Sequence, residues 1–166
     1  TRGVEISRLA KQILNEAQEL IQIGAKEIIL LGQNVNAWSQ PNGKDTDMTF
    51  AQLINEISEL NIERIRYITS HPRDMTEELM KAHRDIEKLQ PYLHLPVQSG
   101  SDKILKEMNR NYSSQEYIEI IDRTREYKED IAISGDFIVG FPGETDDDFE
   151  ATLDIVCLLY TSDAAD

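Results

Sequence analysis

The sequence predicts an α/β fold with a parallel sheet, on three observations. Apolar runs typical of strands alternate with amphipathic segments typical of helices. Each of the four predicted strands is followed by a helix, and such βα repetition gives parallel strands with right-handed connections. The Gly-rich and polar segments all follow a strand. Four repeats are too few for an eight-stranded barrel, so an arc of a barrel and part of a doubly wound sheet both remain open.

The elements predicted in the first half are, in order, a helix at 7–23, a strand at 26–31, a helix at 49–60, a strand at 64–69 and a helix ending near residue 88. Apolar residues recur at helical spacing in the first helix, and Gly24 is a typical stop. The first strand reads KEIILL, a run typical of strands buried on both faces. Thr49 and Gln52 have the spacing of a capping box. Asp74 and Glu77 predict the beginning of the third helix.

The elements predicted in the second half are a strand at 92–98, a short helix at 101–108, a helix at 113–128, a strand at 131–140 and a last helix from 145. Pro96 is expected near the end of its strand. Ser101 and Thr145 are typical N-caps, and Ser113 with Glu116 forms a second capping box.

Composition limits the class of protein. The 166 residues have 40% hydrophobic and 29% charged content and a net charge of −14, which argues against this chain alone binding a phosphate backbone. No apolar run reaches the ~20 residues of a membrane helix, so a cytoplasmic protein is expected. The single cysteine, Cys157, excludes a disulfide framework or a cysteine-cluster metal site within these residues. The chain begins at Thr1, which suggests a piece of a longer protein.

Four loops, GQNVNAW, SHPRD, QSGSD and GFPGET, follow the four predicted strands. Parallel α/β folds bind ligands at the carboxyl ends of their strands, so the loops together predict one composite ligand site. Glycines around Pro142 suit close backbone approach to a flat ligand such as adenine. Gln98 and Ser99 precede a helix N-terminus, which suits ribose hydroxyls or an anion. Ordinary turns and N-caps explain the same loops.

Arginine and histidine supply the remaining candidates. Arg110 could bind a ligand carboxylate or be solvated. His71 could act as an acid, base or ligand, although a hydrogen-bonded loop residue is the commoner role. His83 is expected to face solvent, and His94 the core or the barrel interior. The sequence has no Ser-His-Asp order and no HExxH pattern, which disfavours hydrolase and zinc chemistry.

Five segments occur in a characteristic order, TRGVEISR, LLGQNVNAW, RIRYITSHP, LHLPVQSGSDKILKEMNR and SGDFIVGFPGET. Together they resemble the radical S-adenosylmethionine (SAM) methylthiotransferases, and LGQNVNAW resembles the branch that acts on tRNA. The resemblance covers residues 1–156. It implies an arc of a partial parallel (β/α) TIM-like barrel that lacks its first strand. Residues 157–166 do not match and are expected to be a non-native or disordered tail.

The resemblance also implies cofactors and a reaction. Full-length family members use SAM and two [4Fe–4S] clusters, whose cysteine ligands are absent from this chain. They add a methylthio group to C2 of N6-isopentenyladenosine at position 37 of tRNA, and tRNA is the implied partner. The same resemblance allows the branches that act on threonylcarbamoyladenosine or on an aspartate of a ribosomal protein. A catalytically inert binding module is the alternative from another class.

Site residues follow from the matching segments. The implied cofactor-binding residues are Gln33, Asn34, Gln98, Ser99, Arg110, Val139, Gly140 and Phe141. Those expected to support the cluster loop are Arg2, Glu5 and Arg8. Asn36, Ser70 and His71 are expected to face the substrate.

Overall fold

The computed structural model describes residues 6–40 and 47–160, except for the side chain of Tyr160. Its elements are α1 (Ala10–Gln22), β1 (Glu27–Leu30), η1 (Val35–Ala37), β2 (Ser39–Gln40), β3 (Met48–Thr49), α2 (Phe50–Ser58), β4 (Arg64–Tyr67), η2 (Pro72–Asp74), α3 (Glu77–Asp85), β5 (Tyr92–His94), α4 (Asp102–Glu107), α5 (Ser114–Tyr127), β6 (Ala132–Ser134) and α6 (Asp146–Tyr160). The alternation of strand and helix confirms the predicted α/β class.

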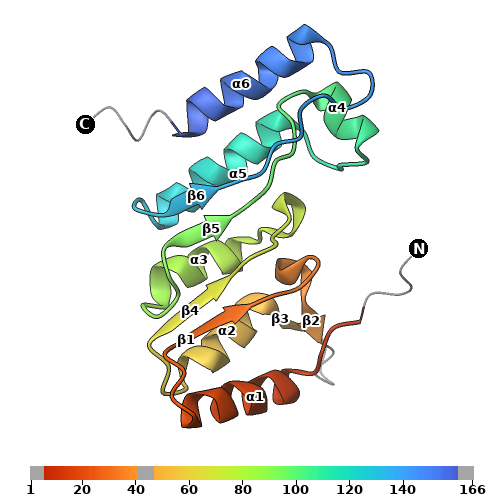
Figure 1. Ribbon diagram of the computed structural model, residues 1–166. Helices are drawn as coiled ribbons and strands as arrows, with labels where there is room; N and C mark the ends of the chain where they lie inside the picture. The colour runs from red at the N-terminus through yellow and green to blue at the C-terminus, as the bar shows by residue number, and fades with distance from the viewer. Residues whose placement is uncertain (1–5, 41–46, 161–166) are drawn as a thin grey trace.

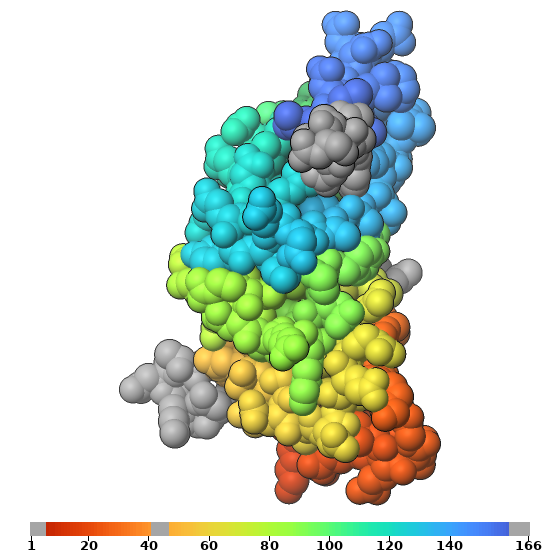
Figure 2. Space-filling view, turned by 90° about the vertical axis from the view of Figure 1, so that its left-hand side faces the viewer, coloured from red at the N-terminus to blue at the C-terminus, as the bar shows by residue number. Residues whose placement is uncertain are grey.

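The four main strands lie side by side in the order β1, β4, β5 and β6, with α2, α3 and α5 behind them (Figure 1). β1 pairs with β4 and β5 with β6, both in parallel, and an isolated parallel bridge from Ile65 to Leu89 links the two pairs. Neighbouring helices contact one another in the order α1, α2, α3 and α5. Successive segments therefore stack along the long axis of the molecule in chain order (Figure 2), as in an arc of a barrel.

Alternation along the strands separates two faces of this sheet. Ile28, Ile65, Tyr67 and Leu93 are buried in the apolar core. On β1 the alternate residue Ile29 is 49% exposed, which corrects the expectation of a strand buried on both faces. Among the described residues, helices cover one face of the sheet and leave the other open.

Hydrogen-bonding side chains set several helix ends as the sequence predicts. Both capping boxes are present, and Ser101 caps α4. α3 differs, because its N-cap is Thr76 and Asp74 instead lies in η2. The side chain of Thr76 accepts a hydrogen bond from the backbone N–H of Leu79, three residues later. Asp74 and Glu77 have the same spacing, which is why the sequence predicts the cap two residues too early. α3 also ends at Asp85 rather than near residue 88.

Regular strand structure is shorter than predicted in β5 and β6. The ladder covers only Tyr92–His94 and Ala132–Ser134, although pairing continues irregularly. Gln98 donates its backbone N–H to Asp136 over 3.0 Å and accepts from Ile138 over 2.8 Å. Gln98 has a φ of 77°, a left-handed conformation that interrupts the extended backbone.

His83 is buried rather than facing solvent. Its Nε2 lies 2.7 Å from the hydroxyl of Tyr67, which is also buried. Burial lowers the pKa of His83 to about 4, so the imidazole is neutral near pH 7. The charged residues Lys81, Arg84 and Asp85 next to His83 favour solvent exposure in the sequence, and the packing of α3 instead turns His83 inward with its apolar neighbours.

α6 continues past the expected tail boundary at residue 157 and runs to Tyr160. Leu159 is buried, and its backbone oxygen accepts a hydrogen bond from Arg125 over 3.1 Å. Residues 161–166 of the expected tail lie outside the described part of the chain.

Candidate functional site at the carboxyl ends of the strands

The loops after β1 and β4 meet in a cluster of polar side chains, which we call the first rim cluster. It comprises Asn34, Asn36, Ser70, His71 and Asp74. Asn36 forms a reciprocal pair with the backbone of His71, donating over 3.0 Å and accepting over 2.8 Å. Asn34 donates to Asp74 over 2.6 Å. These bonds hold the two loops together although 35 residues or more separate them in sequence.

Two oxygen atoms of the first rim cluster are buried without a hydrogen-bond partner among the described residues. They are Oδ1 of Asn34 and Oγ of Ser70. Buried polar atoms are nearly always satisfied in folded proteins, because an unsatisfied group loses its hydrogen bonds to water. Thr69, next to Ser70, has a φ of 68°, which is strained for a β-branched residue. Unsatisfied polar atoms beside strained backbone are typical of a ligand-binding rim.

His71 is held in one tautomer. Its Nδ1 accepts a hydrogen bond from the backbone N–H of Arg73, so Nε2 carries the proton when the ring is neutral. Burial and the positive charge of Arg110 lower the pKa of His71, and Asp74 opposes them. The ring packs edge-on against Tyr112, with centroids 5.4 Å apart. His71 therefore presents an N–H donor at this rim.

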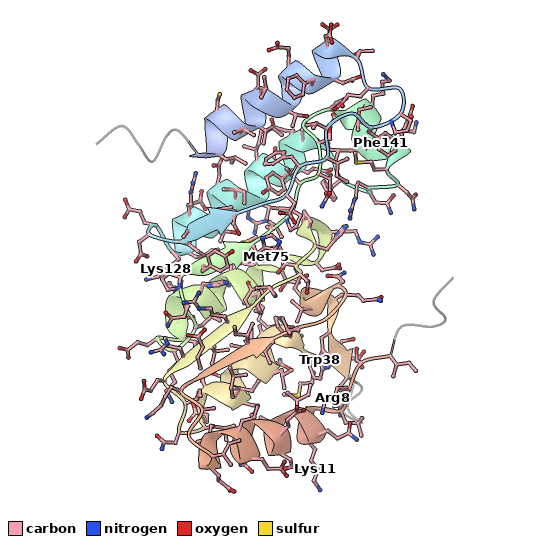
Figure 3. All side chains as sticks on the ribbon, viewed as in Figure 1. Arg8, Lys11, Trp38, Met75, Lys128 and Phe141 are labelled. Carbon is pink, nitrogen blue, oxygen red and sulfur yellow. The ribbon has the colours of Figure 1, made fainter. Side chains whose placement is uncertain are left out.

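A cleft of about 800 Å³ lies between α1 and the unpaired edge of β1. Its lining includes Arg8, Gln33, Asn34 and Trp38. The indole N–H of Trp38 donates to the backbone oxygen of Arg8 over 3.0 Å, and the two residues lie together in Figure 3. The exposed guanidinium of Arg8 pairs with Glu16 over 2.6 Å. Arg2 and Glu5 lie outside the described residues.

The loop after β5 meets α6 in a second rim cluster, which comprises Ser99, Gly100, Ser101, Asp148 and Thr152. The backbone N–H of Gly100 donates to Thr152 over 2.9 Å, and Ser101 donates to Asp148 over 2.6 Å. Hydrogen bonds from Lys103, Ser101 and Thr145 hold the pKa of Asp148 well below its usual range. Ser99 is fully buried with its hydroxyl 3.4 Å from that of Thr152, so it supports the loop from behind.

Arg110 lies close enough to the first rim cluster for its charge to act on His71. It follows α4, and its charge lowers the pKa of His71 while opposing the rise that burial causes in the pKa of Tyr112. The hydroxyl of Tyr112 donates to the backbone oxygen of Val97 over 2.8 Å. The charge of Arg110 thus acts on His71 of the loop after β4 and on Tyr112.

The loop after β6 carries the remaining predicted residues. Val139 and Gly140 are exposed, and Phe141 is half-buried on the side toward which the strands run (Figure 3). Gly140 has a φ of 72°, and its backbone N–H donates to Glu144. The structure therefore places Gln33, Asn34, Asn36, Ser70, His71, Gln98 and Arg110 on one rim, with Val139–Phe141 at its far end.

Sequence reasoning missed Asp74, Asp148 and Thr152. Asp74 and Asp148 lie in segments whose sequence is typical of the beginning of a helix. That local pattern gives no sign of their hydrogen bonds to distant loops. The described residues contain no group of three His, Cys, Asp or Glu placed to bind a metal ion. Nor do any of the described helices have the length and apolar character needed to cross a membrane.

Comparison with known proteins identifies the family. The Radical SAM superfamily model matches residues 1–156. The chain is 57% identical over 159 residues to the tRNA-2-methylthio-N(6)-dimethylallyladenosine synthase of Ruegeria sp. (strain TM1040), covering 94% of this chain and 36% of that protein. It is 53% identical to the protein of that name from Bartonella tribocorum, covering 99% and 36%. The chain thus spans about a third of the length of these relatives.

Solved structures agree on the fold. The cobalamin-dependent S-adenosylmethionine radical enzyme OxsB, with aqua-cobalamin bound, superposes with a TM-score of 0.65 at 16% identity, covering 89% of this chain and 22% of that one. Its complex with aqua-cobalamin and S-adenosylmethionine also gives 0.65, at 18% identity. At these identities the likeness concerns the fold alone. With the family model matching nearly the whole chain, the chain belongs to the radical SAM superfamily.

Proposed function

We propose that this chain is the central part of a tRNA methylthiotransferase that modifies C2 of N6-isopentenyladenosine at position 37 of tRNA. The observation that carries the proposal is the 57% identity to a named synthase along 94% of the chain. The segment GQNVNAW, which distinguishes the tRNA branch, forms the loop of the first rim cluster. The enzyme is expected in the cytoplasm, with tRNA bound mainly by other parts of the protein because this chain has a net charge of −14.

The residues of the rim fit SAM. Oδ1 of Asn34 and Oγ of Ser70 are buried without a hydrogen-bond partner among residues 6–40 and 47–160, so a ligand could hydrogen-bond to both. The guanidinium of Arg110 could bind a ligand carboxylate through two hydrogen bonds. With an iron–sulfur cluster, SAM supplies the radical that removes hydrogen from an unactivated carbon. The cluster ligands must come from elsewhere, because Cys157 is the only cysteine and lies exposed on α6. Two [4Fe–4S] clusters in the full-length enzyme are part of the proposal.

The chain's own residues bind and orient. Gln33 and Asn34 face the aminoacyl group or the substrate, and Arg110 pairs with the carboxylate. Gln98 lies near the ribose, while buried Ser99 keeps the loop of Gln98 in place. The adenine is lined by Val139, Gly140 and Phe141, and the substrate side by Asn36, Ser70 and His71. In this arrangement His71 donates its Nε2 proton in a hydrogen bond to an acceptor on the base.

The test is to express the full-length gene in a strain that lacks 2-methylthio modification and to analyse tRNA nucleosides by mass spectrometry. We expect wild type to restore 2-methylthio-N6-isopentenyladenosine, and Arg110→Ala to fail. Arg123→Ala is the matched control, since Arg123 is exposed on α5 and faces Glu77. Absence of the modification with the wild-type gene would overturn the assignment. Methylthiolated threonylcarbamoyladenosine or ribosomal protein would indicate another branch, and no product at all a binding module.

A further inference from the structure

Lys103 reaches from α4 to the loop after β6. Its Nζ donates one hydrogen bond to the backbone oxygen of Gly143 over 2.9 Å and another to Oδ2 of Asp148 over 2.8 Å. The chain between β6 and α6 passes α4 (Figure 1), and a Cβ atom at Gly143 would lie 3.8 Å from Oε2 of Glu107 on the same helix. The loop after β6 therefore lies against α4 at Gly143.

The contacted part of this loop is a tight turn. The backbone N–H of Glu144 donates to the backbone oxygen of Phe141 over 2.9 Å, and Gly143 has a φ of 86°. Pro142 precedes this glycine, which gives the residue pattern of a type II turn, with proline second and a left-handed glycine third. The backbone N–H of Gly140 donates to the carboxylate of Glu144 and closes the segment on itself. Because the turn is internally bonded, a contact at Gly143 also fixes the position of Phe141.

Lys103 is itself oriented by Asp148. The carboxylate of Asp148 also accepts hydrogen bonds from Ser101 over 2.6 Å and from the hydroxyl of Thr145 over 2.8 Å, which fixes it at the beginning of α6. The hydrogen bond with Asp148 raises the pKa of Lys103, so the ammonium group stays charged and keeps its three donors. The side chain of Lys103 is 51% exposed, and exposed ion pairs contribute little to overall stability. The position of the loop is therefore the property that Lys103 controls.

The position of this loop matters for how a purine is read. The loop carries Val139, Gly140 and Phe141, which the proposed function assigns to the adenine. Adenine has a hydrogen-bond donor at N6 and an acceptor at N1, whereas hypoxanthine has an acceptor at O6 and a donor at N1. Main-chain groups that pair with one base leave unpaired groups against the other, and such pairing weakens steeply with distance and angle. A displaced loop would lose this distinction.

We infer that Lys103 is a positioning residue that holds the loop after β6 against α4 and thereby sets a preference for adenine over hypoxanthine. The inference rests on the proposed function, which assigns this loop to the adenine of SAM. Lys103 acts through the backbone of Gly143 rather than by contact with the ligand. The same helix leads to Arg110, whose backbone N–H donates to Leu105 over 2.8 Å. Lys103 thus ties the adenine loop to the helix that precedes the proposed carboxylate-binding residue.

The experiment measures binding of S-adenosylhomocysteine and S-inosylhomocysteine to the full-length holoprotein by isothermal titration calorimetry. The two probes differ only in the purine, so the ratio of their dissociation constants reports how the base is read. Lys103→Met keeps a long side chain without the ammonium group. It should reduce the preference for S-adenosylhomocysteine about 10-fold, the size expected when one good hydrogen bond is lost. Lys103→Arg keeps a cationic donor and should restore most of the preference.

The matched control is Lys106→Met, because Lys106 is exposed three residues further along α4. This variant should keep the wild-type ratio. An unchanged ratio in Lys103→Met, including equal weakening of both probes, would indicate a merely structural role and overturn the inference. A ratio in Lys103→Arg as low as that in Lys103→Met, or a wild-type protein without a preference for S-adenosylhomocysteine, would overturn it as well.

Hydrogen exchange gives a second readout that needs no ligand. Amides of residues 139–145 should exchange faster in Lys103→Met than in Lys106→Met, and equal exchange would contradict the inference. The inference and the proposed function fail separately. A reduced ratio in Lys103→Met supports the inference even if the tRNA assay detects no methylthiolation. Restored methylthiolation with an unchanged ratio in Lys103→Met rejects the inference and keeps the function.

Discussion

The two rim clusters are built from similar residues but differ in whether their hydrogen bonds are complete. In the second cluster the hydroxyls of Ser101 and Thr152 are engaged, and α6 closes over the loop. In the first cluster Asn34 and Ser70 each keep a buried oxygen without a partner among the described residues. A satisfied cluster rigidifies the fold, whereas an unsatisfied one carries a free-energy cost that a ligand can relieve. We therefore expect the second cluster to act as scaffold and propose that the first cluster faces the ligand.

The largest loss of stability is expected on substitution of Gly100. A Cβ atom there would lie 2.1 Å from the backbone oxygen of Ala151, so α6 would have to move. Gly100→Ala should lower the free energy of unfolding by about 3 kcal/mol or more, measured by urea denaturation. Gly32→Ala is the control, because its Cβ would meet nothing closer than 3.4 Å. Equal stability of the two variants would show that α6 does not press on this loop.

A smaller loss of stability is expected on substitution of Asn36. Asn36→Ala removes both bonds to the backbone of His71 and leaves a buried N–H and C=O unsatisfied. The free energy of unfolding should fall by about 1–3 kcal/mol in the same assay. A cost below about 0.5 kcal/mol would mean that the loops after β1 and β4 are not held by this pair.

Asp148 tests the charge within the scaffold cluster. Because its pKa is lowered on folding, its ionised form stabilises the native state above the unfolded pKa of about 4, and this contribution is lost as the pH falls toward the folded value. Asp148→Asn should reduce the urea midpoint at pH 7. The difference between wild type and variant should narrow below about pH 4. A difference that is constant from pH 7 to pH 2.5 would exclude the carboxylate charge as its cause.

The smallest effect on stability is expected at Ser70. Its buried hydroxyl has no hydrogen-bond partner among the described residues, so Ser70→Ala should change the free energy of unfolding by less than about 0.5 kcal/mol or stabilise slightly. The same variant should lower methylthiolation in the complementation assay. A loss of stability like that of Asn36→Ala would place Ser70 in the scaffold and remove the contrast between the clusters.

Local signals explain which elements the sequence predicts well. Capping boxes at Thr49 and Ser113 act over three residues, and both helices begin where they are predicted. Strand ends depend on the neighbouring chain, and the left-handed Gln98 shortens the regular part of β5 in a way that no local pattern indicates. The prediction that His83 faces solvent is wrong for a similar reason, because its burial depends on how α3 packs against the sheet.

The sequence by itself determined the α/β class, the order of elements, the family and the loops that carry the site, because periodicity, caps and motifs are properties of short segments. Only the tertiary structure decided which side chains meet. It buried Ser99 beneath α6, joined Asn36 to His71, and aligned His94 with Asp136. Contacts between residues far apart in sequence depend on strand register and helix packing, which are fixed by burial over the whole chain.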